Sequence, residues 1–183
     1  MHQKKYILSK LEKRGLLTGR GSWKLPMVPE GKTPPMDKTT AEYATALKKA
    51  QEEVGTLMWL AIKTRADIAA TVSVASSLQS KNPTEALDVV AGVWRYLAMT
   101  WNEVSVLGSH EKSEDLRLEI ATDASLSPGG DKSRSGVVIS LNSIPVHWSS
   151  SKQSLTALSS CESEISAAAV SYTHLTLPTI LLV

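Results

Sequence analysis

Apolar residues recur every three or four positions through residues 39–101, which is the spacing that one face of an α-helix requires. The clearest series is Leu87, Val90, Trp94 and Leu97. A shorter series covers residues 1–14, where lysines surround the apolar positions and Gly15 follows as a C-cap. The pattern predicts helices around a common core, and we interpret their tryptophans as core residues with no cofactor role.

Two start signals divide the helical region. Thr64 and Asp67 have the spacing of a capping box, which predicts a helix that continues through Ala70, Val74 and Leu78. Asn82 followed by Pro83 is a second start, because Asn caps a helix well and Pro fits its first turn.

After Trp101 the apolar residues repeat every 2 residues instead of about every 3.6. Leu116, Leu118 and Ile120 alternate with other residues in a predicted strand that runs into Asp123. Residues 136–141 and 145–148 predict an antiparallel pair of strands joined by a turn at residues 142–143. A helix is expected to begin at Ser159 or Ser160. The order is therefore strand, hairpin, helix.

Two segments have a different character. Residues 18–38 are rich in Gly and Pro, which predicts an extended linker. Residues 171–183 contain no Asp, Glu, Lys or Arg, and Pro178 is expected to stop any helix there. We assign this tail no function, and two explanations stay open: sequence foreign to the gene, or a frameshifted end.

Composition excludes several classes of protein. Of the 183 residues 42% are hydrophobic and 21% are charged, which is typical of a globular chain. The net charge of +2 gives no strong basic field, so any nucleic-acid binding must come from local patches. A single cysteine, Cys161, excludes an internal disulfide framework. The sequence shows no signal peptide and no apolar run long enough to span a membrane.

The best candidate constellation is Asp123 with Glu164. Asp123 lies at the end of a predicted strand, and Glu164 lies in the first turns of the helix after the hairpin. Clustered carboxylates of this kind bind Mg²⁺, and two such ions can activate water against a phosphodiester. Each residue also has a structural interpretation, since Asp is common in turns and Glu favours a helix N-terminus.

Several stretches resemble the signature motifs of the ribonuclease H domain in copia-type retrotransposon Pol polyproteins. Residues 146–164 are similar to the motif W-S-S-K-K-Q-x-x-x-A-L-S-S-T-E-A-E. Upstream matches lie at residues 55–60 and 64–69 (G-S-L-x-Y-L and T-R-P-D-I-A), 94–97, 121–125 and 132–136. The resemblance covers about residues 3 to 170, in order. Within it, Cys161 replaces a Thr that we expect at the cap of the last helix.

The resemblance implies an α+β chain in four parts. Residues 1–38 would end a reverse-transcriptase region and form a linker, residues 39–101 a helical connection segment, residues 102–170 the N-terminal half of an RNase H-like domain, and residues 171–183 a tail outside the family pattern. The fold would be a partial, truncated RNase H-like fold of three antiparallel strands followed by a helix. It also implies an intracellular location, in a cytoplasmic particle or the nucleus.

The same resemblance implies a catalytic and metal-binding role for Asp123 and Glu164, with Glu162 ranked behind them. Mg²⁺ or Mn²⁺ would be the cofactor of the complete domain, and an RNA–DNA hybrid would be the partner of the parent polyprotein. The family's two further carboxylates have no counterpart here. We therefore expect the parent to cleave the RNA strand of a hybrid, and this chain to be inactive alone.

Other chemistries find less support. Lys132 and Arg134 are candidates for phosphate contacts, although a solvated loop explains them better. The loop lacks a P-loop ending, the histidines lack zinc-ligand spacing, and no G-x-S-x-G elbow exists. Three hypotheses remain: a ribonuclease H segment, a non-catalytic module that binds the hybrid, and a decayed relic without function.

Overall fold

The computed structural model describes residues 3–17, 26, 34, 36–103, 116–126 and 132–180, with the side chains of the last helix described through residue 173. The chain divides into two compact units, residues 1–105 and 106–183, which are described separately below. Most of the predicted linker at 18–38 lies outside the described residues. Within the described ranges, no helix is long and apolar enough to cross a membrane.

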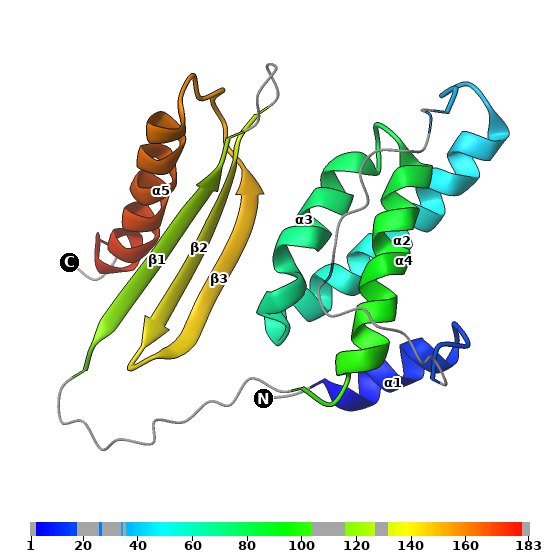
Figure 1. Ribbon diagram of the computed structural model, residues 1–183, viewed down its shortest axis with the longest axis horizontal. Coiled ribbons are helices and arrows are strands. Elements are labelled where there is room, and N and C mark those ends of the chain that lie inside the picture. The colour runs from blue at the N-terminus through cyan, green and yellow to red at the C-terminus, as the bar shows by residue number, and fades with distance from the viewer. Residues whose placement is uncertain are drawn as a thin grey trace. The chain divides into compact units, whose positions relative to one another are not determined.

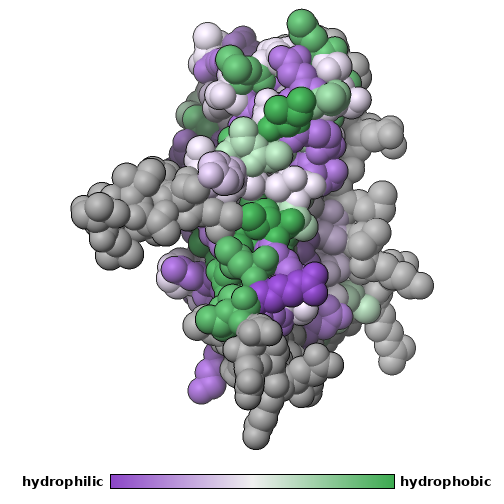
Figure 2. Space-filling view, turned by 90° about the vertical axis from the view of Figure 1, so that its left-hand side faces the viewer, coloured by the Kyte–Doolittle hydropathy of each residue, from purple (hydrophilic) through white to green (hydrophobic). Residues whose placement is uncertain are grey.

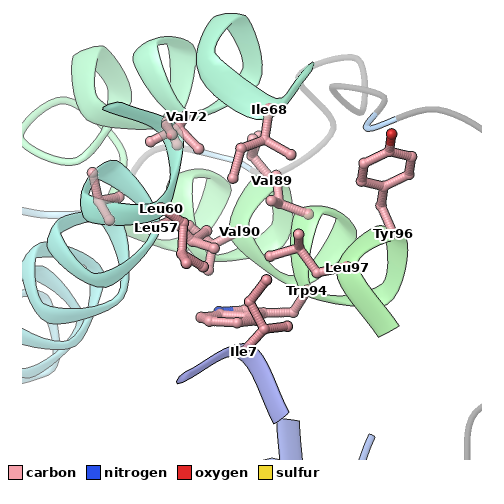
Figure 3. Close-up of a cluster of buried hydrophobic side chains, with 14 of the residues drawn as sticks. Ile7, Leu57, Leu60, Ile68, Val72, Val89, Val90, Trp94, Tyr96 and Leu97 are labelled. Atoms are coloured by element: carbon pink, nitrogen blue, oxygen red, sulfur yellow. The ribbon is translucent and has the colours of Figure 1, made fainter. Parts of the chain in front are cut away.

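The first unit is helical, as the 3.6-residue period predicts (Figure 1). It contains α1 (Lys4–Glu12), α2 (Ala41–Lys63), a 3₁₀ turn η1 (Ala66–Ile68), α3 (Ala69–Leu78) and α4 (Pro83–Thr100). Their apolar faces meet in one core (Figure 3). The apolar helix face that the sequence predicts is confirmed in α4, where Val90, Trp94 and Leu97 are buried and Leu87 is half-buried.

Two of the expected helix ends are confirmed. Gly15 has a φ of 67°, and the backbone N–H of Leu16 donates to the carbonyl of Leu11 at 3.0 Å, so the chain leaves α1 through a left-handed residue. Asn82 is the N-cap of α4, with Pro83 in the first turn. Its side-chain oxygen accepts from the N–H of Glu85, which satisfies one of the free donors of the first turn.

The predicted capping box at Thr64 and Asp67 is wrong. Thr64 instead ends α2 as its C-cap, and a 3₁₀ turn separates it from α3. The carboxylate of Asp67 accepts hydrogen bonds from Arg65 and from the hydroxyl of Tyr96, so it is held by tertiary partners and not by a helix start. The helix expected through Ala70, Val74 and Leu78 is confirmed as α3, and its buried residues are Thr71, Val72 and Ala75.

The second unit is a three-stranded antiparallel sheet in the order β1-β2-β3, packed against α5. Its elements are β1 (Leu118–Ser125), β2 (Arg134–Leu141), β3 (Ile144–Lys152) and α5 (Ser160–Ile180). The expected order of strand, hairpin and helix is confirmed. Asn142 and Ser143 both have positive φ, of 48° and 63°, which is the backbone that a tight two-residue hairpin turn requires.

The last helix differs from expectation, because α5 runs through Pro178 to Ile180. A proline removes one N–H and crowds the carbonyl four residues before it. Pro178 is two residues from Ile180, the end of α5, so nearly all of the helix precedes it. The face of α5 that packs on the sheet carries Ser163, Ala167 and Ser171, so the helical spacing of buried residues reaches the start of the uncharged tail.

The ion pair of Arg65 and Asp67 makes the helical unit sensitive to acid. The guanidinium of Arg65 is buried and also donates to the carbonyl and hydroxyl of Thr100. Burial raises the pKa of Asp67, but the hydrogen bond and charge of Arg65 and the hydrogen bond from Tyr96 outweigh it and hold this pKa below its usual value. The paired, ionised carboxylate therefore stabilises the folded state.

We expect this stabilisation to be present above the unfolded-state pKa of about 3.9 and to be lost as the pH falls through the lower folded-state pKa. Between about pH 5 and pH 3, the free energy of unfolding should therefore fall more steeply for the natural chain than for Asp67→Asn. Urea titrations at several pH values measure this difference. Parallel profiles for the two proteins would show that Asp67 is not held as described.

Candidate functional site

Asp123 lies near the end of β1, directly opposite Gly136 of β2. Its side chain is exposed. The residues next to it, Thr122 and Ala124, are opposite Val137 and Ser135, which are buried on the face that α5 covers. Because side chains alternate along a strand, Asp123 belongs to the other face of the sheet. The side chain of Asp123 and the helix α5 therefore lie on opposite faces of the sheet.

Glu164 lies in the first turns of α5, next to the buried Ser163, and is exposed. The helix packs against β1 and β2, so it lies on the strand that carries Asp123 (Figure 1). The helix that carries Glu164 therefore packs on the sheet that carries Asp123. A close approach of the two carboxylates is untested and stays a prediction.

The donor set suits a hard divalent cation, because carboxylate oxygens are the ligands that Mg²⁺ prefers. Among the described residues, however, no group of three or more His, Cys, Asp or Glu side chains could hold a metal ion. Asp123 and Glu164 therefore supply part of a site at most. A two-metal reaction needs further ligands, and no step of that reaction can be assigned to these two residues alone.

Glu162, which we ranked behind Glu164, has a structural role. Its N–H donates to the hydroxyl of Ser159 at 3.2 Å, and its carboxylate accepts from the N–H of Leu158 at 2.7 Å. Ser159 is therefore the N-cap, in a variant of the capping box in which the carboxylate of Glu162 accepts from the residue before the cap, Leu158, and not from the cap itself. Cys161 lies inside the first turn and is exposed, so the expectation that it replaces the capping residue is wrong.

Ser159→Ala is expected to lower the free energy of unfolding of the sheet unit by about 1 kcal/mol, because one N–H of the first turn loses its acceptor. The matched control is Ser160→Ala, which changes the neighbouring exposed serine and leaves the cap intact. Urea titrations followed by circular dichroism give both values. Equal effects of the two substitutions would contradict the assignment of Ser159 as the cap.

The basic residues of the loop also have partners in the protein. The ammonium group of Lys132 donates to the carbonyl of Ser154 at 2.7 Å, which ties the start of β2 to the segment after β3. Arg134 is the first residue of β2, opposite Lys152 of β3. A phosphate-binding role for Lys132 and Arg134 remains a prediction, and the lysine would have to exchange this carbonyl for a ligand.

Two polar groupings, one half-buried and one buried, were not predicted from the sequence. In the helical unit, the carboxylate of Glu53 accepts from Arg14 and from the indole N–H of Trp94 at 2.8 Å, and the guanidinium of Arg14 lies 4.0 Å from the ring centroid of Trp94. In the sheet unit, Gln153 joins β2 to α5. No local spacing announces such contacts, because they join positions far apart in the sequence.

Apolar side chains gather on the surface of the sheet unit that carries α5 and β1 (Figure 2). Leu118 and Ile120 of β1 are 52% and 42% exposed, and Ile165 and Val170 of α5 are also exposed. These β1 residues are opposite Leu141 and Ile139 of β2. The edge strand therefore carries apolar surface that the described part of the unit leaves open to water.

Comparison with known proteins finds a relative that is similar in sequence along most of this chain. The chain is 31% identical over 168 residues to the retrovirus-related Pol polyprotein from transposon RE1 of Arabidopsis thaliana. The match covers 90% of this chain and 11% of that polyprotein. No protein-family model matches the chain, and no solved structure matches it. The similarity establishes a distant homology to a copia-type retrotransposon Pol polyprotein.

Proposed function

We propose that this chain, a distant relative of a retrotransposon Pol polyprotein, joins a reverse-transcriptase region to a ribonuclease H domain and supplies the first half of that domain. The complete domain cleaves the RNA strand of an RNA–DNA hybrid with the help of Mg²⁺ or Mn²⁺. Asp123 and Glu164 are its contribution to the metal site. The chain by itself has no nuclease activity, since two carboxylates are too few for two metal ions.

The observation that carries this proposal is the order and packing of the sheet unit. An acidic residue lies near the end of the first of three antiparallel strands, and a second acidic residue lies in the first turns of the helix that packs on that strand. This is the arrangement that the resemblance implies for an RNase H-like domain. The capping box of Ser159 and Glu162 fixes where the helix begins, and so fixes which turn carries Glu164.

The exposed edge of β1 supports the same proposal. An edge strand with apolar side chains open to water is prone to pair with another strand. In a complete domain, further strands would cover this edge and bring additional carboxylates to the side of the sheet where Asp123 lies. The chain spans about 11% of the relative's length, so the rest of a parent protein has ample sequence for them.

The proposal is tested with a Pol protein that extends beyond this segment. Purified protein is incubated with a hybrid whose RNA strand is labelled at one end, with and without Mg²⁺. We expect shortened RNA in the presence of the metal and an intact DNA strand. Absence of cleavage together with tight binding of the hybrid in a gel-shift assay would instead favour the non-catalytic binding module, and absence of both would favour the relic.

A further inference from the structure

The helical unit contains a pocket of about 340 Å³, which we call the α4 pocket. Its lining comes from the segment that follows α1, from α2 and from one face of α4. The volume falls in the range of roughly 300 to 1,000 Å³ that is typical of pockets for small molecules. Its apolar lining residues are Leu16, Leu87, Val90, Ala91 and Trp94. The pocket therefore offers an apolar floor to a ligand.

The polar lining of the α4 pocket carries more positive than negative charge. It consists of three cationic side chains and one carboxylate, which are Arg14, Lys49, Arg95 and Glu53. The carboxylate of Glu53 accepts hydrogen bonds from the guanidinium of Arg14 and from the indole N–H of Trp94 at 2.8 Å, so its charge is balanced within the wall. Lys49 and Arg95 lie at the exposed rim. A concave surface with this excess of positive charge attracts anions.

The wall of the pocket is ordered before any ligand arrives. The guanidinium of Arg14 also donates to the carbonyl of Lys10 at 2.8 Å and lies 4.0 Å from the ring centroid of Trp94. The side chains of Arg14 and Glu53 are only 21% and 19% exposed. Because these side chains are already held, a ligand does not have to order them, and the entropic cost of binding is reduced.

We propose that the α4 pocket binds a small organic anion with an apolar body, such as an aromatic ring that carries a phosphate group. The apolar body lies against Leu87 and Ala91, and the anionic group faces Lys49 and Arg95 at the rim. This site is independent of the nuclease proposal, since it belongs to the helical unit and not to the unit that carries Asp123.

The test uses 1-naphthyl phosphate as the probe and the ¹⁵N-labelled 183-residue chain as the protein. The indole N–H signal of Trp94 reports on the pocket, and we expect it to shift in a saturable way. Two partial probes are titrated in parallel: 1-naphthol, which lacks the charge, and inorganic phosphate, which lacks the apolar body. We expect each to bind at least about fivefold more weakly, because each makes only one of the two kinds of contact.

Three variants locate the binding site. Ala91→Leu fills part of the pocket with a larger apolar side chain and should weaken binding by about tenfold or more, because the apolar body loses its place. Lys49→Gln removes one rim cation and should weaken binding by about two- to fivefold. The matched control is Lys48→Gln, which changes the neighbouring exposed lysine outside this lining and should leave the affinity unchanged.

Each outcome decides for or against the proposal. Saturable binding that is lost in Ala91→Leu, and weakened in Lys49→Gln but not in Lys48→Gln, supports it. The proposal is overturned if the Trp94 signal shows no saturable shift, if 1-naphthol or inorganic phosphate binds as tightly as 1-naphthyl phosphate, or if a folded Ala91→Leu variant binds like the natural chain. Should Ala91→Leu fail to fold, as judged by amide dispersion, the two lysine variants decide, and equal affinities in them overturn the proposal.

Discussion

Asp123→Asn should abolish Mg²⁺-dependent cleavage of an RNA–DNA hybrid by a Pol protein that contains this segment. The substitution keeps the size of the side chain and removes the charge that a hard divalent cation requires. Metal ions supply several kcal/mol of transition-state stabilisation in such reactions, so we expect the cleavage rate to fall by at least about a thousandfold. Single-turnover assays with excess protein measure this rate without interference from product release.

Glu119→Gln is the matched control for this experiment. Glu119 lies on the same strand and, by alternation, on the same face of the sheet as Asp123, and its carboxylate pairs with Arg117 at 3.1 Å. This ion pair is largely exposed and contributes little. We expect a rate within about twofold of the natural protein, in line with the small effect of an exposed pair. A comparable loss in both variants would show that the assay reports general damage to the strand.

Leu60→Ala should destabilise the helical unit more than any surface change in the same helix. Leu60 is 0% exposed in the core that α2 forms with α3 and α4. Removal of its side chain forfeits apolar burial and leaves a cavity, which costs about 3 kcal/mol. The free energy of unfolding from urea titrations, followed by circular dichroism, is the measured quantity.

The control for this substitution lies two residues away. Ile62 is in the same helix and is 60% exposed, so Ile62→Ala removes a side chain of equal size from water and not from the core. We expect a change within about 0.5 kcal/mol. Similar losses for Leu60→Ala and Ile62→Ala would mean that the buried face of α2 is assigned wrongly.

The elements that were predicted correctly are those whose signal is local. The face of α4 follows from a 3.6-residue period, its start from Asn82 and Pro83, and the hairpin from Asn142 and Ser143. Each of these features depends on residues within one or two turns of chain. Propensity and capping act over the same distance, which is why the sequence pattern sufficed.

The errors arose where a local signal did not decide the structure. The spacing of Thr64 and Asp67 fits a capping box, but Arg65 and Tyr96 bind the carboxylate of Asp67 instead. Pro178 is a helix breaker by propensity, yet α5 continues through it. At the candidate site, the family resemblance favoured Glu164 over Glu162 as a metal ligand. The carboxylate of Glu162 instead caps the helix, which is consistent with that preference. The sequence did not single out Gln153, because its partners Ser135 and Ser163 are defined only by the fold.

The central claim is that this segment holds half of a nuclease site whose remaining carboxylates come from sequence that follows. The most direct measurement is to sequence the genomic locus through the codon for Val170 and beyond. The account predicts a reading frame that continues into further strands with two more acidic residues, in place of the uncharged tail. A locus that encodes residues 171–183 followed by a stop codon would contradict the nuclease claim for this chain.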